Sequence, residues 1–246
     1  MHFIKCSEIW GGIRFADENI KTKGLTASMY CKPFESNEGG DIYYFSVCGK
    51  DILTRIAIGD VAGHGKSVSK ASSQLYDSLS RNMNKPEGKE ILVELNEEIS
   101  KETKKAITTA GIYTINNDAS TLSFSTAGHP PFYMKLKGAE EWSEVMLQNH
   151  TPKGNIPLGT LEGTHFDEET MDVNSGDQFF FLTDGLLEAS NKKGHMFGRA
   201  GLMKVLKQNS DSNMDDLKQQ VLSALSDHVD GGLLTDDLTF MAVEIN

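Results

Sequence analysis

Long apolar runs are absent from the sequence. No stretch approaches the roughly 18 apolar residues that a membrane-spanning helix needs. Charged and polar residues interrupt Met1–Gly12, which therefore lacks the continuous apolar segment of a secretory signal. We expect a cytoplasmic protein that does not enter a membrane.

An excess of positive charge is also lacking. The chain has 24 lysines and arginines against 35 aspartates and glutamates, which gives a formal net charge of −11 at pH 7. Proteins that bind the phosphate backbone of nucleic acids usually carry a basic patch that displaces counterions. This balance argues against a nucleic acid partner.

Cysteine is scarce as well. Cys6, Cys31 and Cys48 are far apart and form no Cys-x-x-Cys pair, so zinc and redox motifs of that kind are excluded. An odd number of scattered thiols is typical of a reducing compartment. We interpret Cys31 and Cys48 as strand residues rather than nucleophiles.

The apolar residues that are present recur with two periods. Helices are predicted where they recur at steps of three and four, and strands where they alternate or are rich in β-branched and aromatic types. The predicted strands are 25–31, 41–48, 52–58, 107–115, 121–126, 132–135, 177–182 and 238–243, and the predicted helices are 68–83, 92–99, 202–206 and 214–225. Residues 138–176, rich in proline and glycine, are predicted as a long connection.

Short segments are predicted to join or begin some of these elements. Ser36–Gly40 is predicted as a turn before strand 41–48, and Gly49-Lys50-Asp51 as the hairpin connection after it. Because such a connection joins antiparallel neighbours, Asp41 and Asp60 are expected on adjacent strands. Ser212 or Asn213 is predicted as the N-cap of helix 214–225.

Several aspartates share one sequence environment. Asp41, Asp60, Asp184 and Asp236 or Asp237 each lie where an apolar strand meets a glycine or threonine turn. A single aspartate in such a place is usually a turn former. If several meet at one location, their like charges repel one another, so a shared location requires bound cations.

The type of ligand indicates the type of cation. Oxygen ligands without nearby histidine or cysteine suit Mn²⁺ or Mg²⁺ rather than zinc. Two such ions about 3.5–4 Å apart hold a bridging water, lower its pKa and clamp the oxygens of a phosphoryl group. The pattern therefore indicates hydrolysis of a phosphoester without a covalent intermediate.

Six short motifs, in this order and spacing, carry a resemblance to a known family. They are Gly39-Gly40-Asp41, Gly59-Asp60-Val61-Ala62-Gly63-His64-Gly65, Thr126-Ala127-Gly128-His129-Pro130-Pro131, Pro157-Leu158-Gly159, Leu182-Thr183-Asp184-Gly185 and Asp236-Asp237-Leu238-Thr239. The set resembles the metal-dependent serine/threonine protein phosphatases (PPM, protein phosphatase 2C-like), in the bacterial branch typified by the stage II sporulation E protein and the sigma-factor regulatory phosphatases. The resemblance implies a phosphatase domain over residues 25–246 and leaves residues 1–24 as an N-terminal extension.

The resemblance also implies a fold and a role for each site residue. The fold class is α+β, with two antiparallel sheets packed as a central sandwich, helices outside in α-β-β-α layers, and two metal ions at one edge. Asp60 would bridge the ions, the backbone carbonyl of Val61 would bind one, and Asp184 and Asp236 would hold the other.

The remaining motif residues have less direct roles. By the same resemblance, Asp41 would contact the metal cluster directly or through water. Asp237 would lie next to the metal ligands and support them rather than act as a primary ligand. His64 lies in the glycine turn, close to where a phosphate would sit, and a general-acid role there is left open. His129 is interpreted chiefly as part of a structural turn. Four other histidines, which have no matching partners, are expected at the surface or in the core: His150, His165, His195 and His228.

The sequence thus predicts a Mn²⁺- or Mg²⁺-dependent protein serine/threonine phosphatase. By resemblance, its substrate is a small phosphorylated regulator of the anti-sigma-factor-antagonist kind in a partner-switching pathway, with a regulatory partner or a homodimer for control. One alternative is a pseudophosphatase that keeps the fold as a binding module, although all the acidic motif positions are present. The other is a phosphomonoesterase that acts on small molecules.

Overall fold

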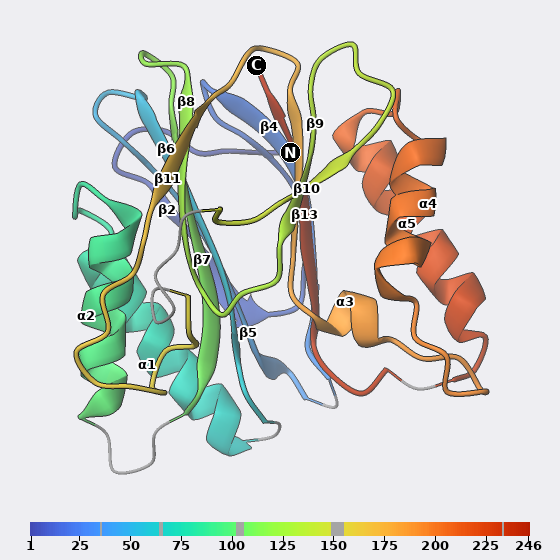
Figure 1. The fold of residues 1–246 in the computed structure, drawn as a ribbon, viewed down its shortest axis with the longest axis horizontal. Coiled ribbons are helices and arrows are strands. Elements are labelled where there is room, and N and C mark those ends of the chain that lie inside the picture. Colours follow the sequence, from blue (N-terminus) through green and yellow to red (C-terminus); the bar gives the residue numbers. More distant parts are fainter. Residues whose placement is uncertain (35, 64–65, 102–105, 149–154, 233) are drawn as a thin grey trace.

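The apolar segments predicted as strands pair into two sheets. The computed structural model describes residues 1–34, 36–63, 66–101, 106–148, 155–232 and 234–246, which form thirteen strands and five helices. The two sheets pack face to face, and helices cover both outer surfaces (Figure 1). The predicted α+β class with α-β-β-α layers is confirmed.

One sheet has seven strands and contains both the most buried strand and the last strand of the chain. In spatial order they are β1 (His2–Phe3), β3 (Ala16–Lys21), β4 (Leu25–Lys32), β13 (Leu238–Ile245), β12 (Gln178–Leu182), β9 (Phe132–Lys135) and β10 (Ser143–Val145). Neighbours are antiparallel except β1 and β3. All five side chains of β12 are buried, as its continuous apolar sequence predicts.

The other sheet has six strands. In spatial order they are β11 (Glu169–Asp172), β8 (Thr121–Ala127), β7 (Thr108–Asn116), β6 (Leu53–Val61), β5 (Glu38–Cys48) and β2 (Ile9–Arg14), all antiparallel to their neighbours. The predicted hairpin between β5 and β6 is confirmed. Its connection, Gly49-Lys50-Asp51, has positive φ at each residue, a conformation common in tight hairpins.

Two groups of helices enclose the sandwich. Helices α1 (Lys66–Asn82) and α2 (Gly88–Ser100) pack on the six-stranded sheet, while α3 (Gly185–Glu188), α4 (Gly198–Gln208) and α5 (Met214–Val229) lie on the side of the seven-stranded sheet. At the start of α5 the side chain of Asn213 accepts hydrogen bonds from the N–H groups of Asp215 and Asp216. Asn213 is thus the N-cap, one of the two residues that the sequence predicts for this position.

The layers produce three apolar cores. One lies between the two sheets and includes Phe45 and Phe181, which are fully buried. A second lies between the six-stranded sheet and the helix pair α1 and α2, and includes Leu95. The third lies under α4 and α5 and includes Leu217. The helical stripes predicted from sequence are the faces that fill the two outer cores.

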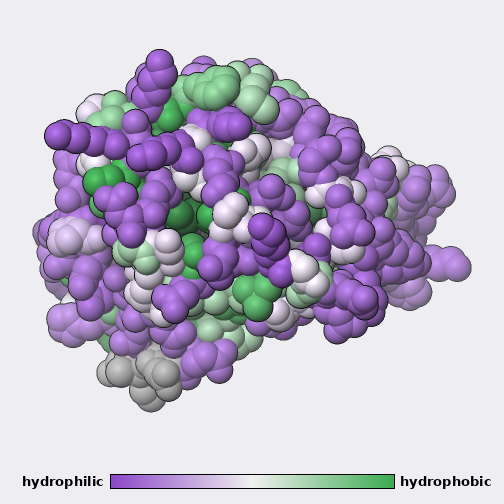
Figure 2. Space-filling model, turned by 90° about the horizontal axis from the view of Figure 1, so that it is seen from above, coloured by the Kyte–Doolittle hydropathy of each residue, from purple (hydrophilic) through white to green (hydrophobic). Residues whose placement is uncertain are grey.

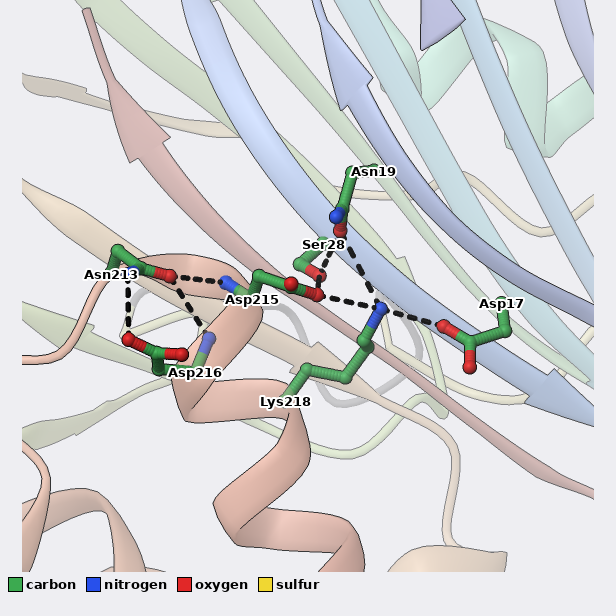
Figure 3. A network of polar contacts seen from close by, with 7 residues as sticks. All are labelled: Asp17, Asn19, Ser28, Asn213, Asp215, Asp216 and Lys218. Carbon is green, nitrogen blue, oxygen red and sulfur yellow. Dashed lines mark hydrogen bonds and ion pairs between the residues drawn. The ribbon is translucent and has the colours of Figure 1, made fainter. Parts of the chain in front are cut away.

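Residues 1–24, predicted as an N-terminal extension, contribute strands to both sheets. Strand β2 pairs with β5, and β3 pairs with β4. Figure 3 shows that β3 is also tied to α5, because the buried ammonium of Lys218 lies 2.6 Å from Asp17 and 3.0 Å from Asp215. Ser28 on β4 reaches the same network through Asn19. The sequence pattern predicts neither β2 nor β3.

Two further predictions about local structure are wrong. Gly39 and Gly40, predicted as part of a turn, lie inside β5. A Cβ on Gly39 would collide with the carboxylate of Asp237, so this glycine allows a close approach rather than a turn. The predicted long connection contains the short strands β10 and β11, each paired at the edge of a different sheet.

Within the described residues, no helix is both long and apolar enough to cross a membrane. Figure 2 views the end of the sandwich that carries the C-terminus, opposite the end where α1 and α3 begin. Hydrophilic residues cover most of that view, with hydrophobic residues in smaller groups between them.

Candidate active site

Asp41 and Asp60 face each other on neighbouring strands of the six-stranded sheet. They are direct register partners of the antiparallel pair β5 and β6, as the sequence predicts for adjacent strands. Their exposed fractions are 2% and 9%, so apolar strands hold both carboxyl groups away from bulk water. The hydroxyl of Thr183 donates a hydrogen bond of 2.8 Å to Asp41 Oδ2. Because Thr183 follows β12, this contact joins the two sheets at the site.

Asp184 and Asp236 come from the other sheet. Asp184 lies between β12 and α3, and Asp236 lies just before β13, the antiparallel neighbour of β12. The end of β12 and the start of β13 therefore meet at one edge. A Cβ on Gly185 would collide with the carbonyl oxygen of Asp237, which shows how closely the two segments approach.

The pKa shifts show that the carboxyl groups of the two sheets act on one another. Burial raises the pKa of Asp60 to about 7, with further contributions from repulsion by Asp184, Asp236 and Asp237. Burial, followed by repulsion from Asp60, raises the pKa of Asp41 well above its ordinary value. The fold therefore brings these carboxyl groups near one another, at the end of the sandwich where α1 and α3 begin (Figure 1).

The carboxylate of Asp237 is hydrogen bonded to backbone N–H groups near the start of β5. Its carboxylate accepts hydrogen bonds from the N–H groups of Phe34 (2.5 Å), Gly40 and Asp41 (3.0 Å). The residue is buried, so these bonds satisfy acceptors that water does not reach. Asp237 thus fixes the start of β5 beside β13 and positions Asp41.

The backbone carbonyl of Val61 lies close to the Asp60 carboxylate, on the side of the strand that faces Gly40. A Cβ placed on Gly40 would lie 2.7 Å from this oxygen and 3.3 Å from Asp60 Oδ1. Glycine at this position therefore leaves room for oxygen atoms from both residues on the same side of the strand. Carboxylate and carbonyl oxygens are the donor types that Mn²⁺ and Mg²⁺ prefer, so the donor set fits such ions.

The carboxylates lie near one another without converging on a single point. Among the described residues, no three His, Cys, Asp or Glu side chains already surround one point as ligands of a single ion. Burial raises the pKa values of Asp41, Asp60 and Asp184, and repulsion from neighbouring carboxylates adds to this rise at Asp41 and Asp60. The cluster is therefore one that a divalent cation would stabilise.

The two proline-containing motifs support the strand next to Asp60. His129 Nδ1 is hydrogen bonded to the hydroxyl of Thr109, the register partner of Asp60 on β7, at 3.1 Å. Leu158 exchanges backbone hydrogen bonds of 3.1 and 2.8 Å with Thr108, the register partner of Val61. These contacts agree with a structural role for the His129 motif.

Other residues near the site escaped sequence reasoning. Glu188 lies one helical turn after Asp184, and burial together with repulsion from Asp184 and Asp236 raises its pKa. The spacing of four residues could have indicated it. Thr183 lies within the Leu182-Thr183-Asp184-Gly185 motif, but the sequence does not indicate the hydrogen bond from its hydroxyl to Asp41. His64 and His150, on the other hand, lie outside the described residues.

The fold and the acidic cluster together define the class: a phosphatase domain of the metal-dependent protein phosphatase 2C type. The chain belongs to the stage II sporulation protein E (SpoIIE) family, whose profile matches residues 51–246. This confirms the predicted resemblance.

Two curated relatives resemble parts of the chain. The phosphoserine phosphatase RsbP of Bacillus subtilis (strain 168) is 23% identical over 217 residues, which cover 85% of this chain and 50% of RsbP. Protein IcfG of Synechocystis sp. is 28% identical over 141 residues, which cover 55% of this chain and 20% of IcfG. The chain thus spans half or less of the length of these relatives.

Solved structures share the fold. The SiaA-PP2C domain of Pseudomonas aeruginosa superposes with a TM-score of 0.77 at 18% identity, covering 89% of this chain and 86% of that domain. The RsbU and RsbW domains of Rv1364c from Mycobacterium tuberculosis give a TM-score of 0.76 at 21% identity, covering all of this chain and 63% of that one. At these identities the likeness concerns the fold.

Proposed function

We propose that this chain hydrolyses phosphoserine or phosphothreonine in a protein, with two Mn²⁺ or Mg²⁺ ions as cofactors. The observation that carries the proposal is the meeting of Asp41 and Asp60 from one sheet with Asp184 and Asp236 from the other. Membership in the SpoIIE family supports it.

We assign each site residue a separate role. Asp60, the Val61 carbonyl, Asp184 and Asp236 would hold the ions, with Asp41 at or behind them. When bound, such ions lower the pKa of water and stabilise the charge on phosphoryl oxygens. The protein supplies the rigid frame for this chemistry. In that frame the Thr183 hydroxyl orients Asp41, as described above.

The frame also has an electrostatic function. Because Asp60 and Asp41 are buried, their charges act in a medium that screens them less than water does. Asp237 holds the backbone of Gly40 and Asp41 through its carboxylate, and it is proposed to support the ligands rather than to replace one. Preorganised groups of this kind need no rearrangement when the substrate arrives.

The proposed substrate is a small phosphorylated regulator of the anti-sigma-factor-antagonist kind, in a partner-switching pathway. The similarity to RsbP, which is named a phosphoserine phosphatase, supports a phosphoserine substrate. A regulatory partner or a second copy of the chain is proposed to control activity.

Turnover of a phosphoserine peptide and of an aryl phosphate, each with and without Mn²⁺, tests the proposal. We expect Mn²⁺-dependent release of phosphate from the peptide, and a loss of at least about a hundredfold in kcat for Asp60→Asn. An absence of metal-dependent turnover on either substrate would favour the pseudophosphatase alternative. Turnover of the aryl phosphate alone would favour an enzyme that acts on small phosphate esters.

A further inference from the structure

A polar groove lies beside the carboxylate cluster and has no part in the chemistry described so far. It has a volume of about 1040 Å³ and runs between the first turns of α1 and the start of β5. Every described residue that lines it is polar or charged: Arg14, Ser36, Asn37, Glu38, Ser69, Lys70 and Ser73. The groove therefore presents hydroxyl, amide and charged groups to a ligand.

The groove is directly connected to the site. Its floor at Glu38 is followed in β5 by Gly39, Gly40 and Asp41, and the hydroxyl of Ser69 on α1 donates a hydrogen bond of 2.8 Å to the Glu38 carbonyl oxygen. Val68, the residue before Ser69, lies against Gly40, since a Cβ on Gly40 would be 3.2 Å from Val68 Cγ1. A chain that occupies the groove would thus lead to Asp41 and Asp60.

The charge of the groove is opposite to that of its surroundings. Arg14 Nη2 pairs with Glu38 at 2.6 Å and remains largely exposed, so its guanidinium has donors left for another anion. Lys70 is exposed and makes no ion pair within the part of the chain that the structure describes. Among the described residues, the lining thus holds two cations against one carboxylate, in a protein with a net charge of −11.

We propose that this groove binds the segment of the substrate protein that flanks the phosphorylated residue, and that it selects segments with acidic side chains. The inference rests on the proposed function, because it assigns the substrate specificity of the same site. Arg14 and Lys70 attract the carboxylates, while the exposed Ser73 hydroxyl and Asn37 amide bond the backbone of an extended chain. Without these cations, the acidic surroundings of the cluster would repel an acidic substrate.

The test uses phosphoserine peptides that differ only in a run of Glu, Gln or Lys, placed on either side of the phosphoserine. The groove lies on one side of the site, so the run should matter on one side of the phosphoserine. There, for the wild-type chain with Mn²⁺, we expect kcat/KM to be about fivefold higher for the Glu peptide than for the Gln peptide, and lowest for the Lys peptide. Lys70→Glu should remove this preference, and Lys70→Arg should keep it. The preference should also shrink at high salt.

Lys204→Glu is the matched control, since Lys204 is an exposed lysine on α4, away from the groove. It makes the same change of net charge and should leave the peptide preference unchanged. Equal kcat/KM for all peptides, or an equal effect of Lys70→Glu and Lys204→Glu, would overturn the groove assignment while leaving the phosphatase proposal intact.

Binding answers the question independently of turnover. Fluorescence anisotropy of the labelled peptides with Asp60→Asn should show the same order of affinities and the same response to Lys70→Glu. If turnover is absent for every substrate but this order persists, the phosphatase proposal fails and the groove remains a binding site for acidic segments. If the anisotropy shows no order, the groove assignment is wrong.

Discussion

Asp41 and Asp60 owe their proposed role to neighbours rather than to their own sequence positions. Each follows or begins an apolar strand, a feature that sequence alone reveals, and the sequence also predicts that the two strands are adjacent. Their burial and the hydrogen bond from Thr183 required the fold, because Thr183 is 142 residues from Asp41 in the chain. Contacts this distant leave no periodic signal in the sequence.

Asp237 illustrates the same limit at one side chain. Asp236 and Asp237 are adjacent in the sequence and share the same neighbouring residues. From sequence, only the family resemblance assigns them different roles. In the structure it differs, because its carboxylate accepts three backbone N–H groups from the segment around β5. Which of two adjacent carboxylates binds backbone depends on the strand twist and on the glycines opposite, which sequence patterns do not specify.

His129 provides a test by pH. Burial lowers its pKa from the ordinary 6.5 to about 3, an effect that the Leu182 carbonyl partly offsets. In the unfolded chain the imidazole binds a proton below about pH 6.5, whereas in the folded chain it stays neutral down to about 3. Stability is therefore lost as the pH falls through this window, by about 2 kcal/mol between pH 7.5 and pH 5.

Urea unfolding of wild type and of His129→Gln at both pH values measures this contribution. The variant should be less stable at pH 7.5, because it loses the bond to Thr109, but its stability should fall about 2 kcal/mol less on acidification. All carboxylates are common to both proteins, so their titration cancels in the comparison. Parallel pH dependences would contradict a buried, neutral His129.

At the scale of elements, the long periodic segments were predictable and the short or irregular ones were not. Helix α1 and strand β12 have a strong apolar pattern, which burial reproduces. Strand β2 contains Gly11-Gly12, and β3 contains the polar run Asp17-Glu18-Asn19, so neither shows strand composition. They are strands because they pair with β5 and β4, which is a tertiary effect that overrides local preference.

The ion pair that joins α5 to β3 is a second test. Lys218 is 2% exposed and contacts Asp17 and Asp215, which are partly exposed (Figure 3). Lys218→Met keeps much of the volume and removes the charge, so we expect a loss of about 1–3 kcal/mol in the free energy of unfolding. Chemical denaturation measures it.

Lys207→Met is the control for this variant. Lys207 Nζ lies 2.6 Å from Glu141, the same distance as Lys218 Nζ from Asp17. In the Lys207 pair, however, both side chains are exposed. Solvent screens such a pair, so its removal should change stability little. If the two variants lost equal stability, burial would not be the source of the strength of the Lys218 network.

At the scale of the whole molecule, the carboxylate cluster exists only because two sheets meet at one end. We propose that residues 1–24 fold together with the rest of the domain, since they supply three strands and the buried side chains of Ile4, Ile13 and Ile20. Burial of three such side chains is worth about 5–9 kcal/mol, comparable to the total stability of a typical domain.

A chain that begins at residue 25 should therefore lose cooperative thermal unfolding and solubility, because the edges of β4 and β5 become exposed. Circular dichroism on heating and size-exclusion chromatography measure both properties. A truncated chain that unfolds cooperatively at the same temperature as the full chain would instead support a domain limited to residues 25–246.

The central claim, that carboxylates from both sheets form one metal site, is tested most directly by calorimetric titration with Mn²⁺. The wild type is predicted to bind two ions, Asp60→Asn to lose at least about tenfold in affinity, and Asp118→Asn, at an exposed turn between β7 and β8, to bind like the wild type. Binding of Mn²⁺ by Asp60→Asn with wild-type affinity and number of ions would contradict the claim.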